Sequence, residues 1–286
     1  IGCTFEGNRS GSNFNVLSPK GASGGAIYIS ASRALIQNSI FSGNRTGGFQ
    51  PSGTTGSGSA FLFSSTGSPG EITVRGCEFH DNHIAPSTGF QSAPSKGAVH
   101  ILGSPVASIE HCSFSGNRSV FTPGVGYGVG GAITYEGGAP ITRGCIFHDC
   151  GTNPVASDTG VAGTVTQCFS DVTMTGTGNQ TGDPRFVDSF GGDLSLRYDS
   201  SCIDVPGLPT PSYLRDLAGQ ARVMGPFADI GAYEHSQGEG LYPGTGEDLI
   251  LRTLVNGTGD PALNNKTVPS RSILDVELRS PSGVFS

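Results

Sequence analysis

The sequence predicts an all-β chain that folds as a parallel β-helix. Two short motifs, Phe-x-x-Asn and Gly-Gly-Ala-Ile, recur in phase along the first 150 residues at intervals of 33–38 residues. Strand-like segments precede each Phe-x-x-Asn, and helical spacing and helix caps are absent. Such units bury their apolar faces only when they stack into a continuous core, here of about five coils. The motifs begin at Phe5, Phe41, Phe79, Phe114 and Phe147 and at Gly24, Gly58, Lys96 and Gly130, with some substitutions.

Each unit contains two segments that alternate β-branched or aromatic residues with polar ones and are bounded by Gly, Ser and Pro, which is typical of strands. Alternation places Cys77 and Phe79 on one face and Glu78 on the other. We therefore expect the phenylalanines to form one internal stack, and the alanines of the second motif another. The segments are 26–30 and 34–41, then 60–65 and 71–79, 98–102 and 107–114, and 132–136 and 141–147.

The asparagines of the repeat, Asn8, Asn44, Asn82 and Asn117, are interpreted as a structural ladder. Asn tolerates a left-handed backbone, and its side chain can bond the equivalent residue one coil away. Three of these residues also begin formal N-glycosylation sequons, of which the chain has six. Cys150 replaces Asn in the fifth copy. The asparagine ladder therefore ends there, and we expect the structure of the coil to change at this point.

Four of the seven cysteines lie two residues before a repeat phenylalanine and are expected to be small core residues. Ser39 takes this position in the second unit. Cys150, Cys168 and Cys202 lie outside the pattern, and a disulfide between two of them stays open because the sequence cannot choose a pair. The four patterned cysteines are Cys3, Cys77, Cys112 and Cys145.

The paired motifs resemble the repeats of polymorphic outer-membrane proteins, whose signatures are GGA followed by an aliphatic residue and FxxN. The resemblance covers residues 1–150. It implies a β-helix displayed on a surface, acting as an adhesin or a passenger domain.

A second resemblance covers residues 178–234, which are similar to the closing segment of bacterial choice-of-anchor Q surface proteins. That segment follows a right-handed β-helix in secreted proteins, so the resemblance implies a right-handed coil and extracellular display. We expect residues 1–170 to be the coil and 171–237 a segment that caps its end. The matching phrases are Asp183–Asp188, Gly192–Leu196, Ser201–Asp204, Asp216–Arg222 and Asp229–Glu234.

Residues 244–286 have a different sequence pattern. In 247–255 and 272–283, apolar and polar residues alternate as they do in the strands of a β-sandwich. Two or three strands make an incomplete sheet. We expect a partial β-sandwich-like segment that a longer chain continues or a neighbouring chain completes.

The catalytic candidates are few. A β-helix polysaccharide lyase or glycoside hydrolase needs several carboxylates on one sheet, and no outward column of the aligned coils supplies them. His80, Asp81 and His83 are the best candidates and could bind a metal ion. The favoured interpretation is that they are solvated turn residues, since His148 and Asp149 repeat the pair.

Calcium is a competing interpretation for the aspartates of the second resemblance, because clustered carboxylates are its preferred ligands. Asp183, Asp188 and Asp204 are the candidates. The alternative is that these aspartates stabilise turns by accepting hydrogen bonds from backbone amides, and that no cofactor is bound.

Each loop between coils carries an aromatic residue. These residues either fold back over the outer sheet or form a row of stacking platforms for sugar or protein. They are Phe14, Phe49, Phe90, Phe121 and Tyr127.

A net charge of −7, with the acidic excess after residue 150, argues against a nucleic-acid partner. No apolar run is long enough for a membrane-spanning helix. Ile1 opens inside a repeat unit, so we expect a processed or excised piece of a longer chain.

The expected function is that of an extracellular or cell-surface structural or adhesive protein, rather than an enzyme. It would stack end to end with other copies or with a longer parent chain, forming a filament. The alternative is a carbohydrate-active β-helix or a glycan-binding module, with extracellular polysaccharide as its partner.

Overall fold

The computed structural model describes residues 1–10, 24–46, 58–65, 70–84, 96–103, 106–118, 131–157, 160, 162–235, 250–255 and 274–279. The chain divides into two compact units, Ile1–His235 and Ser236–Ser286, and each is considered by itself. All regular elements in the described residues are strands. Helices of the length and apolar character that membrane crossing requires are absent from this part of the chain.

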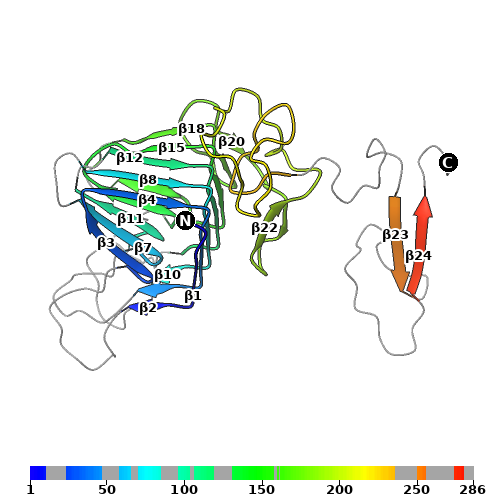
Figure 1. The fold of residues 1–286 in the computed structure, drawn as a ribbon, viewed down its shortest axis with the longest axis horizontal. Coiled ribbons are helices and arrows are strands. Elements are labelled where there is room, and N and C mark those ends of the chain that lie inside the picture. Colours follow the sequence, from blue (N-terminus) through cyan, green and yellow to red (C-terminus); the bar gives the residue numbers. More distant parts are fainter. Residues whose placement is uncertain are drawn as a thin grey trace. The chain divides into compact units, whose positions relative to one another are not determined.

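The first unit is a parallel β-helix, which confirms the predicted fold class (Figure 1). The chain visits three long sheets in successive turns, and the first three turns add a short fourth sheet. Sheet 1 contains β3 (Ile27–Ala31), β7 (Phe61–Ser65), β11 (Val99–Leu102), β14 (Ile133–Glu136) and β17 (Val155–Ser157). Sheet 2 contains β4 (Arg33–Gln37), β8 (Glu71–Arg75), β12 (Val106–Glu110), β15 (Ile141–Arg143) and β18 (Thr164–Thr166).

Sheet 3 holds the phenylalanines. It contains β1 (Thr4–Glu6), β5 (Ile40–Ser42), β9 (Glu78–His80), β13 (Ser113–Ser115), β16 (Ile146–His148), β19 (Phe169–Ser170) and β20 (Gln180–Thr181). Sheet 4 contains β2 (Arg9–Ser10), β6 (Arg45–Thr46) and β10 (His83–Ile84). The strands β17, β18 and β19 form a further coil beyond the five that the motif marks.

The repeat phenylalanines stack inside the coil because parallel pairing holds equivalent residues in register. Consecutive ring centroids are 4.7–5.1 Å apart and the rings lie within 19° of parallel. Phe147 ends the stack, since Ser170 takes the next inward position and Phe169 faces out of the coil. The stack thus ends where the sequence motif ends.

Each longer predicted segment is two strands rather than one. A residue with positive φ turns the chain from sheet 2 to sheet 3, for example Gly76 between β8 and β9 and His111 between β12 and β13. The pattern of alternation runs through this corner, so the break was invisible in the sequence. The corner residues have φ of 48–65° and are Gly2, Asn38, Gly76, His111, Gly144 and Gln167.

The second motif has a steric explanation. Its first glycine has a positive φ, +66° at Gly24 and +63° at Gly58. Its second glycine lies against the next coil, where a Cβ on Gly25 would overlap the carbonyl oxygen of Ser59. On Gly131, a Cβ would overlap the carbonyl oxygens of Asn117 and Cys150. The motif therefore marks a close backbone approach between coils.

The asparagine side chains bond one another along the coil axis. The Nδ2 of Asn44 donates to Oδ1 of Asn82 at 2.9 Å, and Asn82 donates in the same way to Asn117. The expected left-handed backbone, however, lies one residue earlier than predicted. Gly43, Asp81 and their equivalents have positive φ, whereas the asparagines do not.

The cysteine prediction needs a correction at Cys3, which is exposed, whereas Cys77, Cys112 and Cys145 are buried as expected. All seven cysteines are free thiols, so the disulfide considered for Cys150, Cys168 and Cys202 is not formed. Cys168 continues the ladder of patterned cysteines, and Cys150 accepts a contact from Asn117 at 3.9 Å. Cys202 is buried in a separate apolar cluster. The three thiols therefore occupy three different environments.

Residues 183–235, here called the flank segment, do not cap the end of the coil as expected. They cover the outer side of sheet 3 and its corner, from Asn38, which donates to the Arg215 carbonyl at 3.0 Å, to Gln167, which donates to the Gly207 carbonyl. The segment includes the antiparallel pair β21 (Phe186–Asp188) and β22 (Asp193–Leu196). At the end of the coil itself, Met174 packs against the core.

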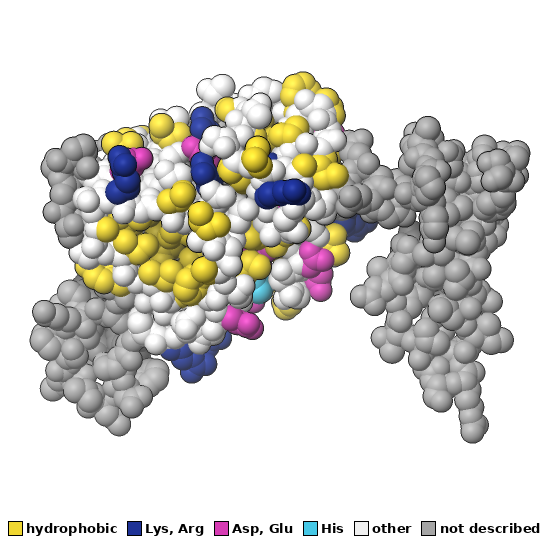
Figure 2. Space-filling model, viewed as in Figure 1, with side chains coloured by type: hydrophobic (Ala, Val, Ile, Leu, Met, Phe, Trp, Pro, Cys, Tyr) yellow, Lys and Arg dark blue, Asp and Glu magenta, His cyan; other side chains and the backbone are white. Residues whose placement is uncertain are grey.

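The opposite end of the coil is apolar. Figure 2 shows hydrophobic side chains gathered in a hollow framed by β1, β3 and β4. Partly buried residues of the first coils pack against the core here, namely Phe5, Ala26, Ile27, Ile29, Ala31 and Ala34. The two ends of the coil are therefore chemically different.

In the second unit, β23 (Ile250–Val255) pairs antiparallel with β24 (Leu274–Arg279). Both strands fall inside the segments predicted to be strands. A completed β-sandwich stays a prediction.

Candidate functional site on the outer face of sheet 3

One column on the outer face of sheet 3 takes a single residue from each coil and is covered by the flank segment. Glu78, Ser113 and Ile146 are in register and at most 2% exposed. The Tyr233 hydroxyl donates to Glu78 Oε2 at 2.6 Å, and the Ala232 amide donates to Ser113 Oγ at 3.0 Å. Ile146 joins the apolar cluster of the flank segment. The column is thus an internal interface.

Glu78 is the most perturbed carboxyl of this face. Burial raises its pKa to about 7, the Tyr233 hydrogen bond lowers it, and the charge of Asp193 raises it. A carboxyl with this pKa can exchange a proton near neutral pH. Its position under Tyr233, however, keeps it out of reach of a large substrate.

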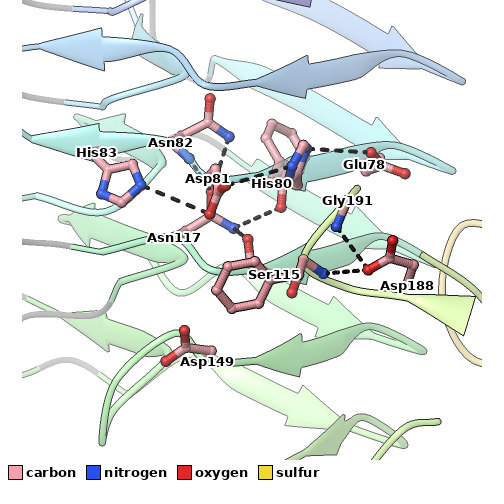
Figure 3. Close-up of polar contacts among 12 residues, drawn as sticks. Glu78, His80, Asp81, Asn82, His83, Ser115, Asn117, Asp149, Asp188 and Gly191 are labelled. Atoms are coloured by element: carbon pink, nitrogen blue, oxygen red, sulfur yellow. Dashed lines mark hydrogen bonds and ion pairs between the residues drawn. The ribbon is translucent and has the colours of Figure 1, made fainter. Parts of the chain in front are cut away.

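His80, Asp81 and His83 continue from Glu78 toward solvent (Figure 3). His80 Nδ1 is 3.9 Å from Glu78 Oε1, and His80 Nε2 is 3.7 Å from Asp81 Oδ2. His83 Nε2 is 3.9 Å from Asp81 Oδ1. These separations are longer than hydrogen bonds. The structure thus brings the three predicted candidates together, with the buried Glu78 as a fourth member that was not among the candidates predicted from the sequence.

The flank segment limits access to this group. Gly192 lies over the His80 ring, where a Cβ would be 2.6 Å from Cε1. Asp81 is the outermost member, since its side chain is 53% exposed. Burial lowers the pKa of His83, with Asp81 opposing that effect and Arg45 and Arg118 adding to it. His83 is therefore mostly neutral at pH 7.

The calcium candidates accept hydrogen bonds from backbone amides. Asp183 accepts from the Arg185 amide at 2.8 Å, Asp188 from Gly191 at 2.9 Å, and Asp204 from Phe227 at 3.2 Å. In the described ranges, no three His, Cys, Asp or Glu side chains are grouped as metal ligands would be. A calcium site stays untested. The loop aromatics Phe14, Phe49, Phe90, Phe121 and Tyr127 all lie outside the described residues.

A buried polar network in the flank segment went unrecognised in the sequence. Arg222 forms an ion pair with Glu234, and its Nη2 donates to the carbonyls of Asp229 and Gly231, both at 2.9 Å. It also donates to His111 Nδ1 of the coil at 2.8 Å. Burial and the Arg222 charge lower the pKa of His111 to about 3, which keeps the ring neutral as an acceptor. The sequence signal for this network is the Asp229–Glu234 phrase, but that phrase does not predict which residue of the coil it contacts.

The family assignment agrees with this geometry. A family model described as the right handed beta helix region matches residues 1–181. The chain belongs to this family. The match ends at β20, the last strand of the coil, so the flank segment of this right-handed β-helix protein lies outside it. Neither the curated proteins nor the solved structures contain a significant match to the chain.

Proposed function

We propose that this right-handed β-helix protein is an extracellular or cell-surface scaffold with a structural or adhesive role. The observation that supports this proposal is the cover over sheet 3. The outward column that carries Glu78, a carboxyl with a strongly raised pKa, is buried under Tyr233 and Ala232. Catalysis on a polymer requires a carboxyl within hydrogen-bond reach of the scissile bond, and Glu78 is 2% exposed.

The experiment is an assay on a panel of acidic and neutral polysaccharides, with and without Ca²⁺. Unsaturated and reducing ends are measured in solution, and retention is measured on the same polymers immobilised. The scaffold function predicts retention on at least one polymer without release of new ends. Release that increases with protein concentration would overturn it.

A carbohydrate-active β-helix is the second candidate, and the group of Glu78, His80 and Asp81 favours it. A carboxyl with a pKa of about 7 suits a general acid, and Asp81 is an exposed carboxylate on the same rim. If this candidate is correct, the wild type releases sugar and Glu78→Gln reduces release at least about a hundredfold. Unchanged release by a folded Glu78→Gln variant would eliminate Glu78 as the acid.

End-to-end assembly is a further part of the proposal, and it depends on contact between the two ends of the coil. The first coil offers an apolar surface around Phe5, whereas the last coil offers Ser170, Thr181 and the loop at Met174. The asparagine ladder also ends at Cys150. Electron microscopy of native extracellular material tests assembly, and isolated particles at every concentration would argue against a filament.

A further inference from the structure

Sheet 4, together with an isolated bridge beyond it, aligns one Arg or His side chain from each of four successive coils. Arg9 pairs in register with Arg45, Arg45 with His83, and His83 with Arg118. Each of these residues directly follows an asparagine of the buried ladder, which fixes the backbone beneath it. The four residues are called the basic row here. In Figure 2, Lys and Arg side chains extend from the molecule beside β2.

The basic row faces solvent. Arg9 and Arg45 are exposed, the Arg118 side chain is 61% exposed, and the His83 side chain is 32% exposed. Because inward and outward residues alternate along a strand, the buried Thr46 after Arg45 confirms that Arg45 points outward. The row is therefore a surface feature along the coil axis rather than part of the core.

Acidic neighbours neutralise only one end of the row. The turn position two residues before the basic residue is Asp81 in the third coil but Gly7, Gly43 and Gly116 in the first, second and fourth. In the fifth coil this position is Asp149, and no basic residue follows it. Arg118 forms an ion pair with Asp149, and Asp81 lies 3.9 Å from His83. Within the described residues, no carboxylate lies within ion-pair distance of Arg9 or Arg45. The exposed Glu6 lies on the first coil but makes no such pair.

We infer that the basic row binds a linear carboxylated polysaccharide, with Arg9 and Arg45 as the principal contacts. Arg9 and Arg45 lie in register on successive coils and place two cations ~4.8 Å apart, which is roughly the length of one sugar unit in an extended chain that carries one carboxylate per sugar. Arginine binds a carboxylate through two parallel hydrogen bonds. Gly7 and Gly43 carry no side chain that would shield the guanidinium groups. The inference rests on the proposed scaffold function and names the ligand class of that scaffold.

Charge density favours this ligand over nucleic acid. A DNA duplex carries one charge per about 1.7 Å, which three arginines cannot match. The protein also has a net charge of −7, which repels a dense polyanion at long range. A polymer with one charge per sugar has a charge spacing close to that of Arg9 and Arg45.

The test uses the whole chain and polygalacturonate as the probe, with methyl-esterified polygalacturonate as its neutral counterpart. Affinity electrophoresis measures binding at several salt concentrations. We expect the Arg9→Gln/Arg45→Gln variant to lose at least about tenfold in affinity for polygalacturonate and to have a weaker salt dependence. The esterified polymer should bind at least about tenfold more weakly to the wild type, because it lacks the charge.

Arg33→Gln is the matched control, because Arg33 is an exposed arginine on β4 of sheet 2, away from the row. It should bind within about twofold of the wild type, and all variants should show the wild-type circular dichroism and unfolding midpoint. An equal loss in Arg33→Gln, or no loss in the double variant, would overturn the inference. Equally tight binding of a DNA duplex would overturn the choice of ligand.

The proposed function can fail separately. If the wild type releases unsaturated sugar from polygalacturonate, the scaffold function is wrong, but Arg9 and Arg45 must still govern affinity for the row to be correct. If no sugar is released and the double variant binds like the wild type, the row is wrong while the scaffold function survives.

Discussion

Asn82 lies in the middle of the asparagine ladder and is completely buried. Its Nδ2 donates to the Phe41 carbonyl at 2.8 Å and to Asn117 at 2.9 Å, and its Oδ1 accepts from the amide and the side chain of Asn44. One side chain thus connects three consecutive coils. Asn8 makes only part of this set, because it ends the ladder at an exposed position.

We expect Asn82→Ala to lower the free energy of unfolding by about 3 kcal/mol, since it leaves several buried backbone and amide groups unpaired. Asn8→Ala is the control and should cost less than about 1 kcal/mol. Chemical unfolding followed by circular dichroism measures both. Equal losses in the two variants would show that the ladder contributes little beyond its exposed end.

Glu78 gives a prediction in pH. Its pKa is about 7 in the folded protein and 4.5 in an unperturbed carboxyl, so the folded state binds the proton more tightly. Stability should therefore be highest below pH 4.5 for this group and fall as pH rises toward 7. The shift corresponds to up to about 3 kcal/mol.

Glu78→Gln retains an acceptor for the Tyr233 hydroxyl and removes the charge, so it should stabilise the protein at pH 8 by about 1–3 kcal/mol. The decrease in stability with rising pH should become smaller in Glu78→Gln but should not disappear, because burial also raises the pKa of Glu234 to about 7. Unfolding curves from pH 4 to 8 measure this, with the exposed Glu6→Gln as control. An unchanged slope in Glu78→Gln would contradict the buried, protonated carboxyl.

At the scale of the element, the turn after each of the first five sheet-3 strands has a left-handed residue. Gly7, Gly43 and Gly116 have φ of 61–64°, and Asp81 and Asp149 have φ of 48–51°. Asp and Asn tolerate this region better than β-branched residues do. The turn therefore accepts two classes of residue for one backbone shape.

Gly43→Asn should cost at most about 1 kcal/mol, whereas Gly43→Val should cost about 2 kcal/mol more. Steric clash does not contribute to this difference, since the nearest atom to a Cβ at Gly43 is the Gly7 amide nitrogen at 3.9 Å. Thermal unfolding of the two variants measures the difference. A valine variant as stable as the asparagine variant would remove backbone strain as the cause.

At the scale of the whole molecule, the flank segment converts an exposed sheet into an internal interface. Gly231 is one point of close backbone contact, with φ of +101° and its amide donating to the Gly144 carbonyl at 2.8 Å. A Cβ there would lie 2.8 Å from both Ile146 Cδ1 and Ser113 Oγ. The segment and the coil therefore fit only with glycine at this position.

We expect Gly231→Val to loosen the flank segment while the coil persists, because the phenylalanine and asparagine stacks lie on the other side of sheet 3. Hydrogen exchange should increase in residues 202–234 and at the outer face of β9 and β13, but not in sheet 1. Gly219→Val is the control, since a Cβ at this exposed position, also at positive φ, meets no neighbour. Uniform loss of protection throughout the coil would show that the two parts fold as one cooperative unit.

The sequence by itself determined the coil. Parallel stacking repeats one environment in every turn, so the columns of Phe, Asn and Cys could be read from spacing alone, and the same register places His80, Asp81 and His83 on one rim. It also determined that the motif ends at Cys150. Local alternation missed the corner at Gly76 because apolar spacing continues through it.

Only the tertiary structure decided what covers the coil. The contacts from Tyr233 to Glu78 and from Arg222 to His111 join residues 155 and 111 positions apart. No local period encodes such a distance, because the flank segment does not repeat. The burial that raises the Glu78 pKa and lowers the His111 pKa comes from that packing, so the chemistry of the site was fixed by the fold rather than by its motif.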